Sequence, residues 1–117
     1  MDIPTKNNRK ILVTQALPYA NAPLHLGHIL EAVQTDIWTR FQNLNGNECH
    51  FFCADDTHGT PVMLKANEMG ITPEKLIEDV YQDHKSTYEL YDINFANFYS
   101  THSLSLIHIS EPTRHCL

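Results

Sequence analysis

Residues 11–28 have the sequence ILVTQALPYANAPLHLGH, and this stretch decides the fold. The β-branched apolar run at 11–14 is typical of a strand buried on both faces of a parallel sheet. Pro18 and Pro23 require an irregular loop after it, because proline lacks the amide proton and restricts the preceding residue. His25 and His28 then fall where this loop gives way to a helix. The stretch therefore predicts a strand, a loop and the start of a helix.

The apolar spacing of the rest of the chain predicts alternating helices and strands. The buried face of the first helix is expected at positions three and four residues apart, which are Leu30, Val33, Ile37, Phe41 and Leu44. Gly46 should end that helix. We expect a second strand at 49–54, helices at 61–69 and 73–90, and a third strand within 92–101. This order implies right-handed crossovers and an α/β layer architecture.

Two further features support this outline. Thr72 and Pro73 are typical of a helix cap followed by the first helical position. The inner face of the helix at 73–90 is expected at Leu76, Ile77, Val80, His84 and Tyr88.

Composition limits the class of protein. The chain has 117 residues, 42% of them hydrophobic and 19% charged, which fits one soluble domain or part of one. It has neither an apolar run of about 18 residues, as a membrane span needs, nor a secretory leader, so we expect no membrane partner and a cytoplasmic protein. The net charge of −6 argues against broad adhesion to nucleic acid. Cys49 and Cys53, roughly 13 Å apart along one strand, are expected to be packing thiols rather than a disulfide.

The sequence His25-Leu26-Gly27-His28 predicts an anion site, because the first amides of a helix are unpaired and the helix dipole is positive there. Two histidines three residues apart share one face of the first turn, and both rings could donate hydrogen bonds to one phosphoryl group. Gly27 would let a flat ring such as adenine approach bare backbone. The helix end should keep both imidazoles neutral. The pattern by itself also fits helix capping or a pair of metal ligands.

Residues 54–61, ADDTHGTP, follow the second strand and should face the same crevice, since ligands bind beyond the carboxyl ends of parallel strands. A carboxylate there can pair with a substrate ammonium while its neighbour caps the next helix. Capping aspartates with a buried His58, or a metal site formed by Asp55, Asp56 and His58, are the alternatives. Leu17 and Tyr19 could form the wall of a pocket for an apolar side chain, or Tyr19 could simply cover the sheet edge.

With these segments the chain resembles the methionyl-tRNA synthetase family of class I aminoacyl-tRNA synthetases. The resemblance covers about residues 9–103, through 11–28, FFCADDTHGTPVMLKANEMGITPE at 51–74 and NFYSTHS at 97–103. It implies the amino-terminal half of a Rossmann-type, HUP-like nucleotide-binding domain with a parallel sheet. The implied reaction condenses methionine with ATP to methionyl-adenylate and pyrophosphate, and then transfers the methionyl group to tRNA(Met).

The resemblance also implies residue roles in ATP binding. His25 and His28 would be catalytic and would bind the ATP phosphates, with Gly27 beneath the adenine and Tyr19 also at the nucleotide. ATP would arrive with Mg²⁺. The zinc of the full-length family would have no ligands in this sequence, and no metal is expected on the chain itself.

For the amino acid, the resemblance implies that Asp56 holds the methionine ammonium group. Leu17 and Tyr19 would line the pocket for its side chain. Asp55 and His58 would only support the loop.

The expected domains are a partial catalytic domain at 1–103 and a non-native tail at 104–117, LSLIHISEPTRHCL, which resembles a translated sequencing adapter. Because the second half of the family's catalytic domain has no counterpart here, we expect little or no activity from this chain alone. A bare edge strand predicts poor solubility. A small nucleotidyltransferase with the same histidine pattern, or a fragment that binds nucleotide without catalysis, are the alternative functions.

Overall fold

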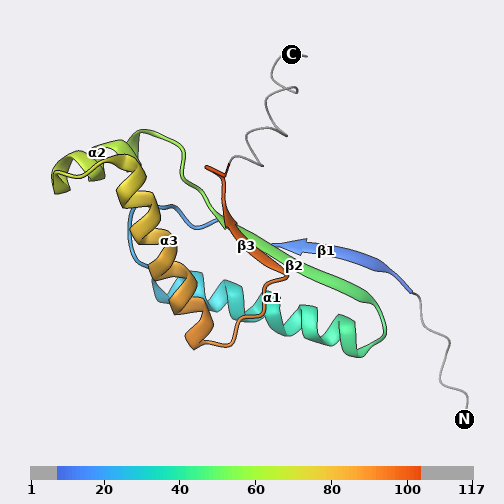
Figure 1. Ribbon diagram of the computed structural model, residues 1–117. Coiled ribbons are helices and arrows are strands. Elements are labelled where there is room, and N and C mark those ends of the chain that lie inside the picture. The colour runs from blue at the N-terminus through green and yellow to red at the C-terminus, as the bar shows by residue number, and fades with distance from the viewer. Residues whose placement is uncertain (1–7, 104–117) are drawn as a thin grey trace, which may run out of the picture.

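The computed structural model describes residues 8–103, which form a parallel sheet with its helices packed on one face (Figure 1). The strands are β1 (Lys10–Thr14), β2 (Glu48–Asp55) and β3 (Asn97–Ser100), in the order β1-β2-β3. The register places Val13 opposite Phe51 and Ala54 opposite Tyr99. The expected α/β architecture is therefore confirmed, whereas the expected tail at 104–117 lies outside the described residues.

Three helices connect the strands. Helix α1 (Leu26–Leu44) joins β1 to β2, and α2 (Thr60–Met69) and α3 (Pro73–Leu90) lie between β2 and β3. The predicted boundaries of α3 are correct, since the Thr72 side chain accepts a hydrogen bond from the Lys75 amide at 3.2 Å. Within residues 8–103, no helix has the length and apolar character that crossing a bilayer requires.

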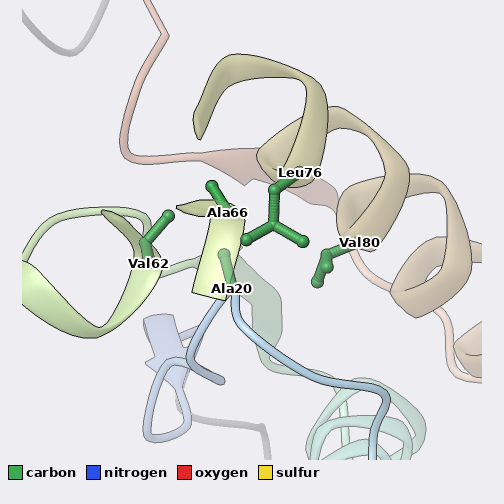
Figure 2. Packing of buried hydrophobic residues seen from close by; sticks show 5 residues of the cluster. All are labelled: Ala20, Val62, Ala66, Leu76 and Val80. Carbon is green, nitrogen blue, oxygen red and sulfur yellow. The ribbon is translucent and has the colours of Figure 1, made fainter. Parts of the chain in front are cut away.

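The core is built as two clusters, one on the helix-bearing face of the sheet and the other between α2, α3 and the loop that follows β1. The cluster between α1, β2 and α3 consists of Ile29, Ala32, Phe51, Tyr88 and Ile93. Figure 2 shows the other cluster, in which the side chains of α2 and α3 gather around the loop that follows β1; its members are Ala20, Val62, Ala66, Leu76 and Val80. The predicted inner face of α3 is confirmed, because four of its five positions are buried and the fifth packs against this cluster.

The predicted buried face of α1 is wrong at four of its five positions, and only Val33 packs against the core. Leu30, Ile37, Phe41 and Leu44 are exposed, while the buried positions are Ile29, Ala32, Asp36 and Thr39. The first three buried positions each precede a predicted one by one residue, which corresponds to a rotation of about a quarter to a third of a turn. The small side chains of Ala32 and Thr39 let the helix approach the sheet closely. The larger apolar stripe of α1 consequently faces away from the sheet.

The sheet is also open on its second face. Leu12 of β1 is 73% exposed and Tyr99 of β3 is 49% exposed, so the prediction that the first strand is buried on both faces is wrong. The connections from β1 to β2 and from β2 to β3 run in the same direction across the sheet. Right-handed crossovers then place all three helices on the same side. In the described part of the chain, β1 pairs on one side only. Among residues 8–103 no strand pairs with its other edge, which is the feature from which poor solubility is predicted.

The strand thiols behave as expected. Cys49 and Cys53 are free and buried. Burial raises the pKa of the Cys53 thiol to about 12. A thiol in this state is a packing group with little thiolate character.

Candidate functional site

The loops that follow β1 and β2 lie side by side at the carboxyl edge of the sheet. Tyr19 and Asp56 form a parallel β-bridge beyond the ends of the strands. The Ala20 amide donates to the Asp56 carbonyl at 2.9 Å, and the Asp56 amide donates to the Pro18 carbonyl at 2.9 Å. The two candidate ligand loops are thus held together by backbone hydrogen bonds, in the arrangement that the sequence predicts.

The two histidines of this site cap the start of α1. His25 is the N-cap, and its Nδ1 accepts from the amides of Gly27 at 3.1 Å and His28 at 3.4 Å. The Nδ1 of His28 accepts in return from the His25 amide at 3.2 Å, which completes a capping box. The rings are stacked with their centroids 3.7 Å apart and their planes at 15°.

This geometry selects one form of each imidazole. A ring nitrogen that accepts a hydrogen bond carries no proton, so each ring is neutral with its proton on Nε2. Burial, reinforced by the nearby imidazoles of His25 and His84, lowers the pKa of His28. Capping occupies Nδ1 and leaves Nε2–H as a donor, so the capping and phosphate-binding interpretations use different atoms of the same rings.

Gly27 is required by the shape of this cap. A Cβ at position 27 would lie 2.9 Å from Cε1 of His25, closer than real contacts allow. The absence of a side chain therefore lets the His25 ring fold back over the first turn, and it also leaves the backbone at position 27 exposed. The expected contact of Gly27 with adenine stays a prediction.

The two neighbouring aspartates have different surroundings. Asp55 is fully buried, with Oδ1 2.7 Å from Nδ1 of His84. Asp56 is half-buried. Among the described residues its carboxylate accepts one long hydrogen bond, 3.4 Å, from the His58 amide. The expectation that one aspartate caps the next helix is wrong: α2 has Gly59 as its N-cap and no side-chain cap. Asp55 is directed to His84 instead, and Asp56 retains carboxylate acceptor capacity for a ligand.

The predicted pocket residues lie at the surface. Leu17 is 41% exposed and Tyr19 is 37% exposed. The Tyr19 hydroxyl donates to the His58 carbonyl at 2.6 Å, so its ring extends across the loop that follows β2. The end of β3 joins this rim, since Nε2 of His58 lies 3.3 Å from the Thr101 carbonyl and the Thr57 amide donates to Thr101 Oγ1 at 3.0 Å. The site is an open shelf built from the ends of three strands.

The sequence analysis missed the role of His84. Its burial was predicted, but the ring also lies 2.7 Å, through Nε2, from the carbonyl of Ala22 in the histidine loop. A polar residue in an apolar helical stripe was the available signal, and it does not indicate the partner. Within residues 8–103, no group of three or more histidine, cysteine, aspartate or glutamate side chains is arranged to hold a metal ion.

A parallel sheet with paired ligand loops at its carboxyl edge, one of them running into a histidine-capped helix start, defines an α/β domain suited to binding a nucleotide. The family model described as tRNA synthetases class I (M) matches residues 11–114. The chain therefore belongs to the class I tRNA synthetases.

Several solved tRNA synthetases have a similar structure. Mycobacterium tuberculosis methionyl-tRNA synthetase bound by methionyl-adenylate is similar with a TM-score of 0.78 and 28% identity, over 82% of this chain and 19% of that one. A second structure of that enzyme in complex with methionyl-adenylate gives 0.80 and 27%, over 85% and 19%. Leucyl-tRNA synthetase of Agrobacterium radiobacter K84, in a ternary complex with tRNA and LeuAMS, gives 0.87 and 23%, over 98% and 15%. The chain spans about a fifth or less of each relative, and the last likeness concerns the fold alone.

Proposed function

We propose that this chain carries the ATP- and methionine-binding loops of a methionyl-tRNA synthetase. The observation that carries the proposal is the bridge between Tyr19 and Asp56, which sets a carboxylate beside the loop leading to His25 and His28. The methionine assignment is supported by the 27–28% identity to the methionyl enzyme and by the sequence ADDTHGTP. The family match favours a tRNA synthetase over the small nucleotidyltransferase that the histidine pattern alone allows.

In this proposal His25 and His28 donate Nε2–H hydrogen bonds to oxygens of the ATP phosphates. A carboxylate oxygen of methionine forms a bond to the α-phosphorus while the bond to the leaving pyrophosphate breaks. Negative charge on the phosphoryl oxygens then lies beside two fixed donors and the positive end of α1, which stabilise it without rearranging. Gly27 provides the uncovered backbone against which adenine lies.

Mg²⁺ enters this proposal as a partner of the nucleotide. Residues 8–103 offer no three-ligand cluster, and Asp55 is occupied by His84. The chemistry of the ion is to neutralise charge on the phosphates of the leaving pyrophosphate. The chain's own part is limited to the histidine donors.

Asp56 pairs with the methionine ammonium in this scheme, and Leu17 and Tyr19 border the thioether side chain. Asp55 and His58 support the loop that follows β2 without contacting the ligand. The acceptor of the second step is tRNA(Met), and the reaction takes place in the cytoplasm, where ATP and tRNA are available.

The same structure favours binding over turnover by these 117 residues. Leu17, Tyr19 and His25 lie on an open shelf, so nothing in the described part of the chain excludes water from the reacting groups. We propose that the chain alone binds ATP weakly and catalyses little or no adenylate formation.

Isothermal titration calorimetry with ATP tests this function. His25→Ala and His28→Ala should each weaken binding at least about fivefold, since each removes one hydrogen bond to a charged group. His50→Ala removes an exposed histidine whose ring contacts Glu48 and Phe52 within β2, and this variant should bind like the parent chain. Equal affinities in all four proteins would contradict the proposed site.

Amino-acid specificity needs a separate measurement. Chemical-shift perturbation of the Leu17, Tyr19 and Asp56 amides should be larger with methionine than with leucine at the same concentration. A larger response to leucine would overturn the methionine assignment. Methionine-dependent exchange between ATP and pyrophosphate by the chain alone would contradict the expectation of inactivity.

A further inference from the structure

A buried histidine–aspartate pair connects the two ligand loops. His84 and Asp55 are both fully buried, and Nδ1 of His84 is 2.7 Å from Oδ1 of Asp55. The second carboxylate oxygen of Asp55 is buried and has no hydrogen-bond partner in the described part of the chain. Removing two polar side chains from water in this way costs free energy unless they form a hydrogen bond with each other.

The ring of His84 contacts both loops at once. Its Nε2 donates to the Ala22 carbonyl at 2.7 Å, and Ala22 precedes the N-cap His25 by three residues. Its Nδ1 faces Asp55, the immediate neighbour of Asp56. One rigid, planar side chain from the middle of α3 therefore connects the backbone that presents the histidine pair to the strand end that presents the carboxylate.

The surroundings of His84 favour a proton on both ring nitrogens. Burial by itself lowers the pKa of His84, but the hydrogen bonds to Asp55 and to the Ala22 carbonyl outweigh burial and raise that pKa above its ordinary value. The charged or titratable groups that act on this ring are Asp55 from β2, Asp83 from its own helix and His28 from α1. The His84 cation also disfavours a second positive charge on His28.

We propose that His84 is a positioning residue whose ring sets the separation between the histidine loop and the aspartate loop. The inference rests on the proposed function, because the loops matter only if one binds phosphate and the other an ammonium group. The Tyr19–Asp56 bridge fixes the loops at one point, and the contacts of His84 with Ala22 and Asp55 fix them at a second. Two points of attachment prevent the rotation that one bridge alone allows.

Three variants test the role of His84. His84→Gln keeps an amide donor for Asp55 or Ala22 without the charge, and His84→Leu removes both. Ile93→Ala is the matched control, because Ile93 is buried in the cluster between α1, β2 and α3 and its apolar side chain forms no hydrogen bond to either loop, so its loss destabilises the fold alone. The readouts are the ATP dissociation constant and the pKa of the His28 ring, followed by NMR of labelled histidine.

The expected order of ATP affinity is parent chain, then His84→Gln, then His84→Leu, with the last about tenfold weaker than the parent. The pKa of His28 should rise in both His84 variants because a positive neighbour is lost. Ile93→Ala should leave both quantities unchanged in its folded population. Unchanged values in His84→Gln, or equal shifts in Ile93→Ala, would overturn the proposal.

The unmodified chain provides a test that does not depend on a variant folding. Deprotonation of His84 on raising the pH should shift the amide resonances of Ala22, His25 and Asp56 with the midpoint of the His84 ring itself. Amides that do not move at that midpoint would refute the coupling. If the chain fails to bind ATP at all, the proposed function fails, while the His28 pKa and these amide shifts still decide the role of His84.

Discussion

Replacing Gly59 by alanine should damage the loop that follows β2 more than a glycine substitution normally does. Gly59 is the N-cap of α2 with φ 121° and ψ 164°, a conformation that is essentially restricted to glycine. A Cβ at this position would overlap the hydroxyl oxygen of Tyr19. That hydroxyl donates to the carbonyl of His58, so the substitution both strains the backbone and displaces the tyrosine ring.

The size of the effect follows from these two contributions. Backbone strain in such a region costs about 1–3 kcal/mol. Loss of the hydrogen bond from Tyr19 to His58 adds about 0.5–1.5 kcal/mol. We therefore expect Gly59→Ala to lower the free energy of unfolding by roughly 2–4 kcal/mol. The matched control is Gly70→Ala, where φ is 67° and no atom lies within 4 Å of the added Cβ, so only a left-handed penalty of about 1–2 kcal/mol applies.

Urea unfolding followed by far-ultraviolet circular dichroism measures both variants. Gly59→Ala should have the lower free energy of unfolding, by about 1.5 kcal/mol at the middle of the two ranges. It should also reduce the response of the Leu17 and Asp56 amides to methionine, because Tyr19 is no longer held over the loop. The steric argument is refuted if the two alanine variants unfold at the same urea concentration.

Three further predictions concern stability and solubility. Asp36→Ala should lower the free energy of unfolding, measured in urea, by about 2–3 kcal/mol. Buried Asp36 accepts hydrogen bonds from the Asn94 amide at 3.0 Å and from Arg40 Nε at 2.7 Å. An effect no larger than that of Asp79→Ala, at an exposed position, would contradict this. The raised pKa of His84 predicts that stability falls as pH rises from the ordinary histidine value of 6.5 through the folded-state pKa, because the folded chain binds that proton more tightly than the unfolded chain. His28, with its lowered pKa, works in the opposite direction below pH 6.5, so thermal unfolding of His84→Gln should lose the decline at higher pH and show a smaller effect of His28 below pH 6.5. Leu12→Lys should raise the protein concentration that stays in solution after centrifugation and change the free energy of unfolding by less than about 0.5 kcal/mol. The reason is that Leu12 is 73% exposed on β1, whose outer edge has no partner strand among residues 8–103. A large loss of stability would show that this face is covered.

Local chemistry predicted most element boundaries. Thr72 with Pro73 identifies the start of α3, and Gly70 in its left-handed conformation ends α2, because these residues act through their own backbone and nearest neighbours. The proximity of the two ligand loops also followed from the sequence, since the carboxyl ends of adjacent parallel strands must lie at one edge.

Features that depend on distant partners were not predictable in this way. The apolar spacing of α1 shows which stripe is able to be buried, but not which one meets the sheet, and the stripe with Ala32 was chosen over the larger one with Phe41. The pairing of His84 with Asp55 spans 29 residues and has no periodicity. Capping by His25 and His28 was one of the alternatives that the sequence allowed, but a histidine N-cap is outside the usual preference for serine, threonine, aspartate and asparagine, so the sequence alone did not select it.

The bridge between Tyr19 and Asp56 has a consequence for the proposed amino-acid pocket. The carbonyl and amide of Asp56 are tied to Ala20 and Pro18, and the contacts of His84 with Ala22 and Asp55 add a second attachment, so the two loops move as a single body. Separation of the two backbones at this point therefore cannot make space for a bulkier ligand side chain. The space has to come from rotation of the exposed Leu17 and Tyr19 side chains. The rotamers of these two residues therefore set the size of the pocket.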